Sequence, residues 1–205
     1  MSPVTATLWL LAAYLLGATP TSYVAGRLAK GIDLREYGSK NLGATNVYRV
    51  LGWAWAIPVG LIDIAKGAVP VAVFGPWAHG APGFPVFLGL AAVLGHIFSP
   101  YVGFKGGKGV ATAAGMFLAL APYAVLISLP VWGLCLWATG YVSLSSILVA
   151  VLFPVLILLT PHAGPPAVVA SIGLAVLIVY SHRANIRRLL AGTENRFRTR
   201  KELAP

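Results

Sequence analysis

From Gly109 to His182 the chain runs for 74 residues without a single Asp, Glu, Lys or Arg. Soluble domains carry about 25% charged residues, whereas here charged residues make up 10% and hydrophobic residues 58% of a 205-residue chain. A bilayer core of about 30 Å needs about 20 apolar helical residues, and an uncharged stretch of this length holds several such segments. The sequence therefore predicts an integral membrane protein.

Apolar runs bounded by glycine, proline and charge predict an all-α fold with seven transmembrane helices in one polytopic domain, residues 1–205. The expected ranges are 7–28, 53–75, 84–104, 109–121, 122–140, 145–160 and 166–182. The first run is too long for a signal-peptide core and has no basic segment before it, so we expect it to stay in the membrane. Fusing the two runs that meet at Pro122 gives an even number of spans as the alternative.

The basic residues are distributed asymmetrically along the chain. With the amino terminus outside, 14 of the 15 Lys and Arg are cytoplasmic: five from Arg27 to Arg49, Lys105 and Lys108, and seven from Arg183 onward. The positive-inside rule then predicts a cytoplasmic carboxyl terminus with a basic tail at 196–205, in a cell inner or plasma membrane. An even number of spans would break this pattern.

The net charge of +10 does not by itself indicate nucleic acid. The basic residues form no soluble recognition face with interleaved aromatic residues, so we expect no nucleic-acid partner. Cys135 is the single cysteine, which excludes a disulfide within the chain and a thiolate metal cluster. The chain has no HExxH motif and no carboxylate pair near its basic segments, so neither a metal nor another cofactor is expected.

The first polar segment is YGSKNLGATNVYRVLG, residues 37–52. Its glycine, serine and asparagine residues favour turns with free backbone N–H groups, and Thr45, Asn46 and Arg49 share one face of a following helix. Backbone amides and a guanidinium are suitable donors for a phosphate or carboxylate. The segment is a candidate anion site, and a solvated loop with an arginine anchor is the alternative.

The second polar segment contains GFKGGKGVATAAG, residues 103–115, of which we call 103–109 the glycine loop. A Walker A motif is excluded because no hydroxyl residue follows Lys108. Closely spaced glycines still allow backbone N–H groups to converge on an anion that Lys105 and Lys108 neutralise. Positive-inside topology explains the lysines alone but not the glycines. His96, nine residues before Lys105, is expected near the same membrane face.

The third polar segment is YSHRANIRRLLAGTENRF, residues 180–197. His182, Asn185 and Arg188 recur every three residues, which places them on one helical face. A basic amphipathic helix on anionic lipid is the alternative, and it suits Arg183 and Arg187 best. His182 and Asn185 remain candidates for a site.

Asp63 and Lys66 lie three residues apart within the second predicted span. Charged residues inside a membrane usually mark function, but an ion pair that holds helices together is an equal interpretation. We assign both residues a structural role.

Three segments closely resemble the cytoplasmic motifs of the bacterial membrane-bound acyl-phosphate:glycerol-3-phosphate acyltransferase family: GSKNLGATNVYR (38–49), GHIFSPYVGFKGGKGVAT (95–112) and HRANIRRLLAGTENR (182–196). Chain length, helix number and motif order agree as well. The resemblance implies acyl transfer from acyl phosphate to the 1-hydroxyl of glycerol-3-phosphate, the first acylation of phospholipid synthesis. It implies these substrates and membrane lipids as partners, no cofactor, and a cytoplasmic active site; we expect a monomer.

The family's motif residues map onto Ser39, Asn41, Thr45, Asn46, Arg49, His96, Lys105, Gly106, Gly107, Lys108, Gly109, His182, Asn185 and Glu194. On this resemblance we assign Ser39, Arg49, Lys105 and the glycine loop to the substrate phosphates. We assign His182 and Asn185 to orienting glycerol-3-phosphate, and Arg188 to binding. Glu194 is expected to brace the last helix against an arginine.

Two points are left open by the residues. Lys40 stands where the family commonly has glycine, which adds a cation and puts the local backbone geometry in question. The group that removes the hydroxyl proton is either a substrate phosphate oxygen or a histidine, His96 or His182.

Two other classes of protein fit the composition. A transporter for a phosphorylated solute should place polar groups at the bilayer midplane, where the chain has little beyond Asp63 and Lys66. A non-catalytic scaffold would leave the dense Gly, Asn and Ser positions unexplained.

Overall fold

The structure, a computed structural model, describes residues 1–161 and 164–197. Among these residues every regular element is a helix and no strand occurs, which confirms the all-α prediction. The chain divides into two compact units, Met1–Leu120 and Ala121–Pro205. The expectation of a single polytopic domain stays a prediction, and residues 198–205 of the expected basic tail lie outside the described residues.

The first predicted span forms two helices, α1 (Pro3–Ala18) and α2 (Thr21–Lys30). Pro20 causes the break, because proline lacks an N–H group and pushes the residue before it out of the helical conformation. The break leaves backbone carbonyls that need donors. The Ser99 hydroxyl donates to the Ala18 carbonyl at 2.5 Å, and the Lys66 ammonium donates to the Thr19 carbonyl at 2.9 Å.

The rest of the first unit contains α3 (Ala44–Leu51), α4 (Trp53–Val69), a π-helical turn (Pro70–Phe74), α5 (Gly75–Ala78), α6 (Phe84–Ile97), a 3-10 turn (Pro100–Val102) and α7 (Val110–Leu120). Helix α6 ends before residue 104, where the predicted span ended, because Ser99 precedes Pro100 and is extended. The chain then turns into the glycine loop.

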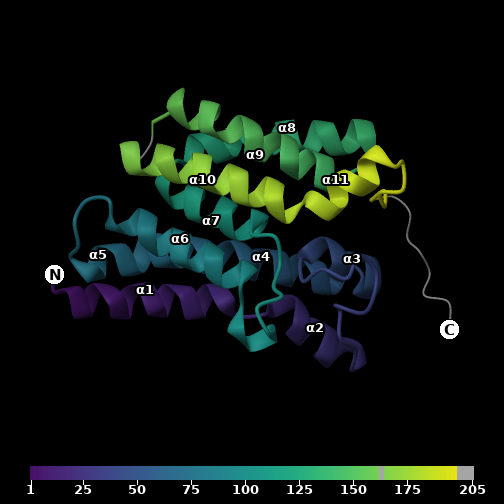
Figure 1. Ribbon diagram of the computed structural model, residues 1–205, viewed down its shortest axis with the longest axis horizontal. Helices are drawn as coiled ribbons and strands as arrows, with labels where there is room; N and C mark the ends of the chain where they lie inside the picture. Colours follow the sequence, from purple (N-terminus) through teal and green to yellow (C-terminus); the bar gives the residue numbers. More distant parts are fainter. Residues whose placement is uncertain (162–163, 198–205) are drawn as a thin grey trace. The chain divides into compact units, whose positions relative to one another are not determined.

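Helices of the first unit approach each other at glycine. Helix α1 runs along α6, and α4 packs on α7 (Figure 1). A methyl group on Gly67 of α4 would overlap the carbonyl oxygen of Thr112, and one on Gly115 of α7 would overlap that of Ile64. The small residues after the glycine loop therefore allow close helix packing.

The second unit contains α8 (Pro122–Thr139), α9 (Val142–Leu158), α10 (Pro165–Ser181) and α11 (Arg183–Leu190). Helix α9 packs against both α8 and α10. The predicted division before Pro122 is confirmed, since Ala121 has an extended φ of −151° between two helices. Helix α11 is bent by 57° from α10, and His182 lies at the bend.

Four helical segments in the described part of the chain are long and apolar enough to cross a membrane: Pro3–Lys30, Trp53–Ala78, Phe84–Val102 and Pro122–Thr139. The bent pair α10 and α11 makes a fifth, while α7 and α9 are apolar but shorter. Helix α7 has 11 residues and spans about 16 Å, roughly half of a bilayer core. Seven spans and their orientation therefore stay predictions.

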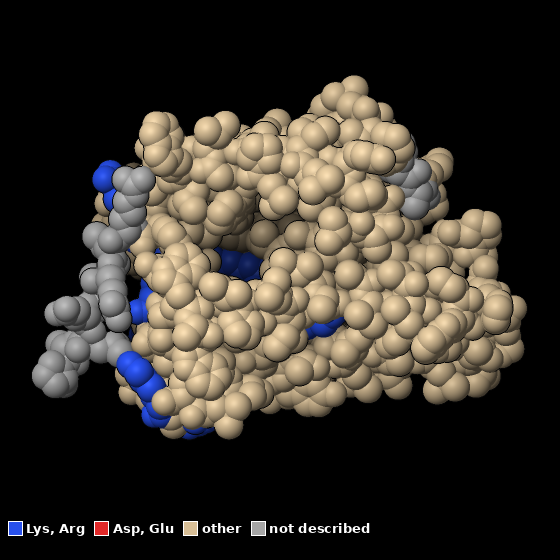
Figure 2. All heavy atoms as spheres, turned by 180° about the vertical axis from the view of Figure 1, so that it is seen from behind, with Lys and Arg blue, Asp and Glu red and all other residues tan. Residues whose placement is uncertain are grey.

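The surface has the character that lipid contact requires. Many large apolar side chains are exposed, for example Leu134 at 65% and Trp137 at 72% on α8. Figure 2 shows a face formed almost wholly by residues other than Lys, Arg, Asp and Glu. Charged groups facing hydrocarbon would each cost several kcal/mol, so this surface fits a multi-pass membrane protein.

Gly115→Ala is expected to destabilise the protein, because the new methyl group forces α7 away from α4. Overpacking of this kind typically costs about 1–3 kcal/mol, and the melting temperature in detergent measures it. Gly133→Ala on α8 is the matched control, since its methyl group meets nothing within 4 Å. Equal melting temperatures of the two variants would contradict the close approach.

Candidate active site

The loop before α3 is shaped by Asn46, whose side chain is 1% exposed. Its Oδ1 accepts the Ser39 N–H at 2.7 Å, and its Nδ2 donates to the carbonyls of Leu34 at 3.0 Å and Tyr37 at 3.1 Å. A side chain on Gly38 would overlap Asn46 Oδ1. Asn46, expected to bind substrate, is thus already engaged with the loop and positions Ser39.

Lys40 adopts a left-handed backbone, with φ at 58°. This conformation costs an L-residue about 1–2 kcal/mol and suits glycine, which accounts for the doubt raised by the lysine at this position. The Lys40 side chain is exposed.

The glycine loop closes onto the end of α6. The Gly106 N–H donates to the Ile97 carbonyl at 3.0 Å and the Gly107 N–H to the His96 carbonyl at 3.1 Å. The expectation that these amides are free for an anion is therefore wrong, because the last carbonyls of α6 need donors and take them. A methyl group on Gly106 would overlap the His96 carbonyl, and one on Gly107 the His96 ring. Close packing is thus the reason for glycine at both positions.

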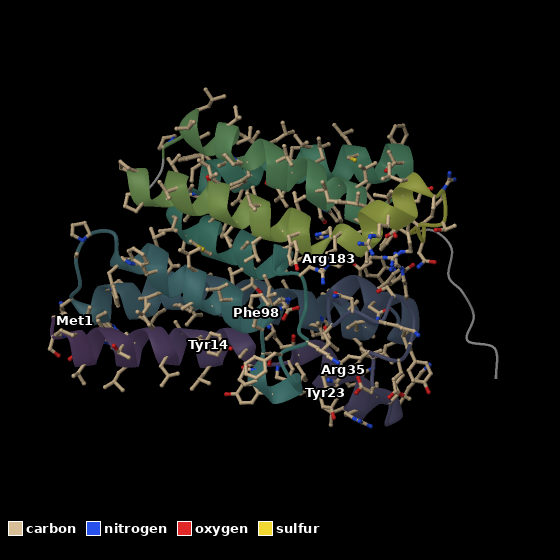
Figure 3. The ribbon with its side chains drawn as sticks, in the orientation of Figure 1. Met1, Tyr14, Tyr23, Arg35, Phe98 and Arg183 are labelled. Atoms are coloured by element: carbon tan, nitrogen blue, oxygen red, sulfur yellow. The ribbon has the colours of Figure 1, made fainter. Side chains whose placement is uncertain are left out.

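Arg35 joins the two polar segments of the first unit. Its guanidinium binds both carboxylate oxygens of Asp33 at 2.6 to 3.1 Å and donates to the Val102 carbonyl at 2.9 Å. It also lies over the Tyr23 ring, 5.5 Å from its centroid (Figure 3). The hydrogen bonds from Arg35 outweigh burial and hold the pKa of Asp33 below its ordinary value.

A cleft of about 360 Å³ opens where these segments meet, lined by Asp33, Arg35, Glu36, Lys40, Lys105 and Gly106. Neither Lys40 nor Lys105 uses its side chain in a hydrogen bond or ion pair with the residues that the structure describes, whereas Arg35 is committed to Asp33. Sequence reasoning found the two lysines but missed Asp33 and Arg35. Their close spacing in a short polar segment was the available signal.

The other expected residues of this unit border the same two segments. Ser39, Asn41 and Thr45 are half-buried in or just after the loop before α3, and Arg49 is half-buried one turn further along α3. Lys108 is half-buried, and Gly109, with φ at 81°, precedes the first residue of α7. That these residues bind substrate stays a prediction.

In the second unit His182 is buried at the bend between α10 and α11. Its Nδ1 lies 2.8 Å from the Ile178 carbonyl. A carbonyl oxygen only accepts hydrogen bonds, so Nδ1 is the donor. This bond to α10 fixes the orientation of the ring.

Glu194 anchors the end of the third motif. Its Oε1 accepts from Asn185 at 2.7 Å and from Ser143 at 2.9 Å, and its Oε2 accepts from Arg188 at 2.6 Å. The predicted brace against an arginine is confirmed, and Ser143 is a partner that sequence reasoning missed. Gly192, with φ at 68°, ends α11 and lets the chain return so that Glu194 reaches these donors.

The environment of Glu194 has two opposing effects on its ionisation. Burial acts to raise the pKa, but the hydrogen bonds from Asn185, Arg188 and Ser143 outweigh it and hold the pKa of Glu194 below its ordinary 4.5. The carboxylate is therefore the stable form at neutral pH.

No group of three His, Cys, Asp or Glu side chains that would hold a metal ion occurs in 1–161 or 164–197. The expectation of a metal-free reaction stays a prediction.

Comparison with known proteins gives consistent results. The family model for glycerol-3-phosphate acyltransferase matches residues 7–192. The glycerol-3-phosphate acyltransferase of Chlorobaculum parvum is 45% identical over 216 residues, covering 90% of this chain and 93% of the relative.

Two solved structures are similar to the whole fold. The crystal structure of PlsY, an integral membrane glycerol 3-phosphate acyltransferase, in its glycerol 3-phosphate form has a TM-score of 0.82 and 38% identity. Its lysophosphatidic acid form has a TM-score of 0.80 and 41% identity, and both comparisons cover 93% of this chain and 94% of the other.

Fold and motifs together define an integral membrane acyltransferase. The chain belongs to the glycerol-3-phosphate acyltransferase family, which acts in phospholipid biosynthesis.

Lys40→Gly is expected to stabilise the protein by about 0.5–1 kcal/mol, because the relief of left-handed strain exceeds the extra entropy that glycine loses on folding. The melting temperature in detergent measures the gain. Lys40→Ala is the control, since it removes the charge but keeps the strain. A Lys40→Gly variant that melts no higher than Lys40→Ala would contradict the strain.

Glu194→Gln is expected to lower the free energy of unfolding at pH 7 by about 1–3 kcal/mol, because an amide cannot accept from all three donors. The folded-state pKa of Glu194 is lowered, so its stabilisation is present above pH 4.5 and is lost as the pH falls through the folded-state value. The difference between wild type and variant should therefore shrink in acid.

Thermal unfolding in detergent from pH 7 to pH 3 measures this difference. Glu36→Gln, which changes an exposed carboxylate, is the control and should melt with the wild type near neutral pH. If the stability difference between wild type and Glu194→Gln stayed constant with pH, the lowered pKa of Glu194 would be refuted.

Proposed function

We propose that this protein transfers a fatty acyl group from an acyl phosphate to the 1-hydroxyl of glycerol-3-phosphate, forming lysophosphatidic acid and inorganic phosphate. The observation that carries the proposal is the cleft of the first unit, where Lys40 and Lys105 face one space without an ion pair in the described part of the chain. The Glu36 carboxylate also lines this cleft, but two ammonium groups that make no ion pair with the described residues suit a phosphorylated substrate in a chain of this family.

The acceptor is supported by similarity. The related PlsY structures have a glycerol 3-phosphate form and a lysophosphatidic acid form, which are the acceptor and the lipid product of this reaction. The 38–41% identity over 93% of this chain's length supports the same acceptor and product for it.

The choice of donor rests on the three motifs and on chemistry. An acyl phosphate is a mixed anhydride whose leaving group is phosphate, so charge neutralisation and positioning supply much of the catalysis. The 1-hydroxyl oxygen attacks the acyl carbon and forms the ester as the carbon–oxygen bond to phosphate breaks. The hydroxyl proton ends on a phosphate oxygen, so the reaction balances without a further reactant.

The residue roles follow the motifs and the geometry. Ser39, Arg49 and Lys105 bind the phosphates, with Lys40, Asn41, Thr45, Lys108 and Gly109 as further contacts. His182 and Asn185 orient glycerol-3-phosphate, and Asn185 is itself held by Glu194. Arg188 is committed to Glu194 through Nε and keeps its other nitrogens for an anion.

Seven spans place the three motifs on the cytoplasmic side of the membrane in this proposal. The distribution of 14 of 15 basic residues supports that orientation. A soluble acceptor then arrives from the cytoplasm, and the acylated product remains in the membrane.

The deciding assay uses the purified full-length protein in nanodiscs, with glycerol-3-phosphate and either acyl phosphate or acyl-CoA, and with a chelator present. We expect lysophosphatidic acid and an equal amount of phosphate from acyl phosphate alone. Lys105→Ala should lower turnover about 10²–10³-fold, as loss of a group that stabilises charge in the transition state does.

Arg187→Ala, which removes an exposed cation of α11, is the matched control and should keep its activity. Product from acyl-CoA alone would refute the donor, and full turnover of Lys105→Ala would refute the role of the loop. In sealed inside-out vesicles, glycerol-3-phosphate added outside should be acylated without permeabilisation. A requirement for permeabilisation would refute the orientation.

A further inference from the structure

A group of buried polar side chains lies beneath the glycine loop. Asp63 and Lys66 of α4 form an ion pair at 2.8 Å, with their side chains 2% and 4% exposed. The same oxygen, Asp63 Oδ1, accepts the Thr21 hydroxyl at 2.6 Å and lies 3.8 Å from His96 Nδ1. These side chains, which we call the buried network, come from α2, α4 and α6.

Such a group is expensive to bury. Removing two charges from water costs several kcal/mol each, and the ion pair offsets this only when its other hydrogen bonds are made. Lys66 also donates to the Thr19 carbonyl at the break between α1 and α2. Apolar residues of similar volume would stabilise the fold about equally well. The desolvation cost of the ion pair therefore suggests that it does more than hold helices together.

His96 connects the buried network to the glycine loop. Its carbonyl accepts the Gly107 N–H at 3.1 Å, and its ring lies so close to Gly107 that a methyl group there would overlap Nε2. On the other side Nδ1 faces Asp63 at 3.8 Å, which is too long for a hydrogen bond but close for a charge acting on the ring. The ring therefore stands between the carboxylate and the loop.

The position of the ring does not suit a general base. His96 is 7% exposed, and the cavity beside it holds about 10 Å³, lined in part by Lys66, Ser99, Gly106 and Gly107. This volume admits about one water molecule and no phosphate ester. A general base must come within hydrogen-bond reach of the proton it removes.

We infer that Asp63, supported by Lys66, is a positioning residue that sets the His96 ring and through it the glycine loop carrying Lys105, and that His96 supports the loop instead of removing a proton. The inference deepens the proposed function and rests on it for its kinetic readout alone. In this inference, α4 keeps the glycine loop in the position where Lys105 can bind the substrate phosphate.

The main variant is Asp63→Leu combined with Lys66→Met in the full-length protein. Removing both charges avoids an unpaired buried ion and should preserve the fold. We expect the backbone amides of residues 104–107 to exchange with deuterium about tenfold faster, because the support under Gly106 and Gly107 is gone. This readout needs no substrate and stands even if the proposed reaction fails.

In kinetics, the same variant should raise KM for glycerol-3-phosphate about tenfold with a smaller change in kcat, because the loop is displaced and the reacting groups remain. The single variant Lys66→Arg, which keeps the ion pair, should match the wild type in both amide exchange and KM. Ser22→Ala is the matched control, since Ser22 is equally buried on α2 and its hydroxyl has no hydrogen-bond partner among the described residues. It should leave amide exchange and KM unchanged.

His96→Gln separates support from proton transfer. We expect its pH profile of kcat to keep the wild-type shape. Loss of one limb of that profile, with amide exchange of the loop unchanged, would overturn the inference in favour of a general base.

Unchanged exchange and KM in the double variant would also overturn it. Should that variant fail to fold, Thr21→Val removes a single hydrogen bond to Asp63 and should shift exchange in the same direction by about two- to threefold. No shift in a folded Thr21→Val would refute the inference equally.

Discussion

The buried ammonium group of Lys66 makes the two contacts that tie the break in the first apolar run to α4. Pro20 breaks the first apolar run, and the Thr19 carbonyl at the break accepts from the Thr21 N–H at 3.0 Å and from the Lys66 ammonium at 2.9 Å. The same ammonium neutralises Asp63. One cation thus links the bend between α1 and α2 to a carboxylate of α4, and removing it alone would leave Asp63 without its counter-ion in a medium of low dielectric constant.

Hydrogen bonds to backbone groups also hold the two polar segments of the first unit in place. Asn46 folds the loop before α3, Arg35 links that loop to the Val102 carbonyl, and the end of α6 takes the amides of Gly106 and Gly107. Every connection satisfies a backbone group that would otherwise be unpaired at a helix end or turn. The backbone around the cleft with Lys40 and Lys105 is therefore held by hydrogen bonds, which is the support that a site relying on positioning requires.

The glycine loop shows where reasoning from residue type stops. Dense glycines next to lysines predicted amides free for an anion, and Lys105 and Gly106 of this loop do line a cleft. The purpose of the glycines was different at residues 106 and 107, because a helix end close in space competes for the same N–H groups. The spacing of glycines in the sequence indicates a flexible backbone. It does not indicate which carbonyl oxygens will accept the backbone N–H groups of that segment.

The sequence by itself determined the class of protein, the approximate helices, the break before Pro122 and the three polar segments, because the cost of charge in hydrocarbon and the geometry of proline act on each segment separately. Glu194 and an arginine were also paired correctly, since they lie six residues apart in one motif. The tertiary structure alone decided that Asp63 faces His96, that Arg35 reaches Val102 and that Ser143 binds Glu194. These contacts join residues 33, 67 and 51 positions apart, and no local periodicity encodes such distances.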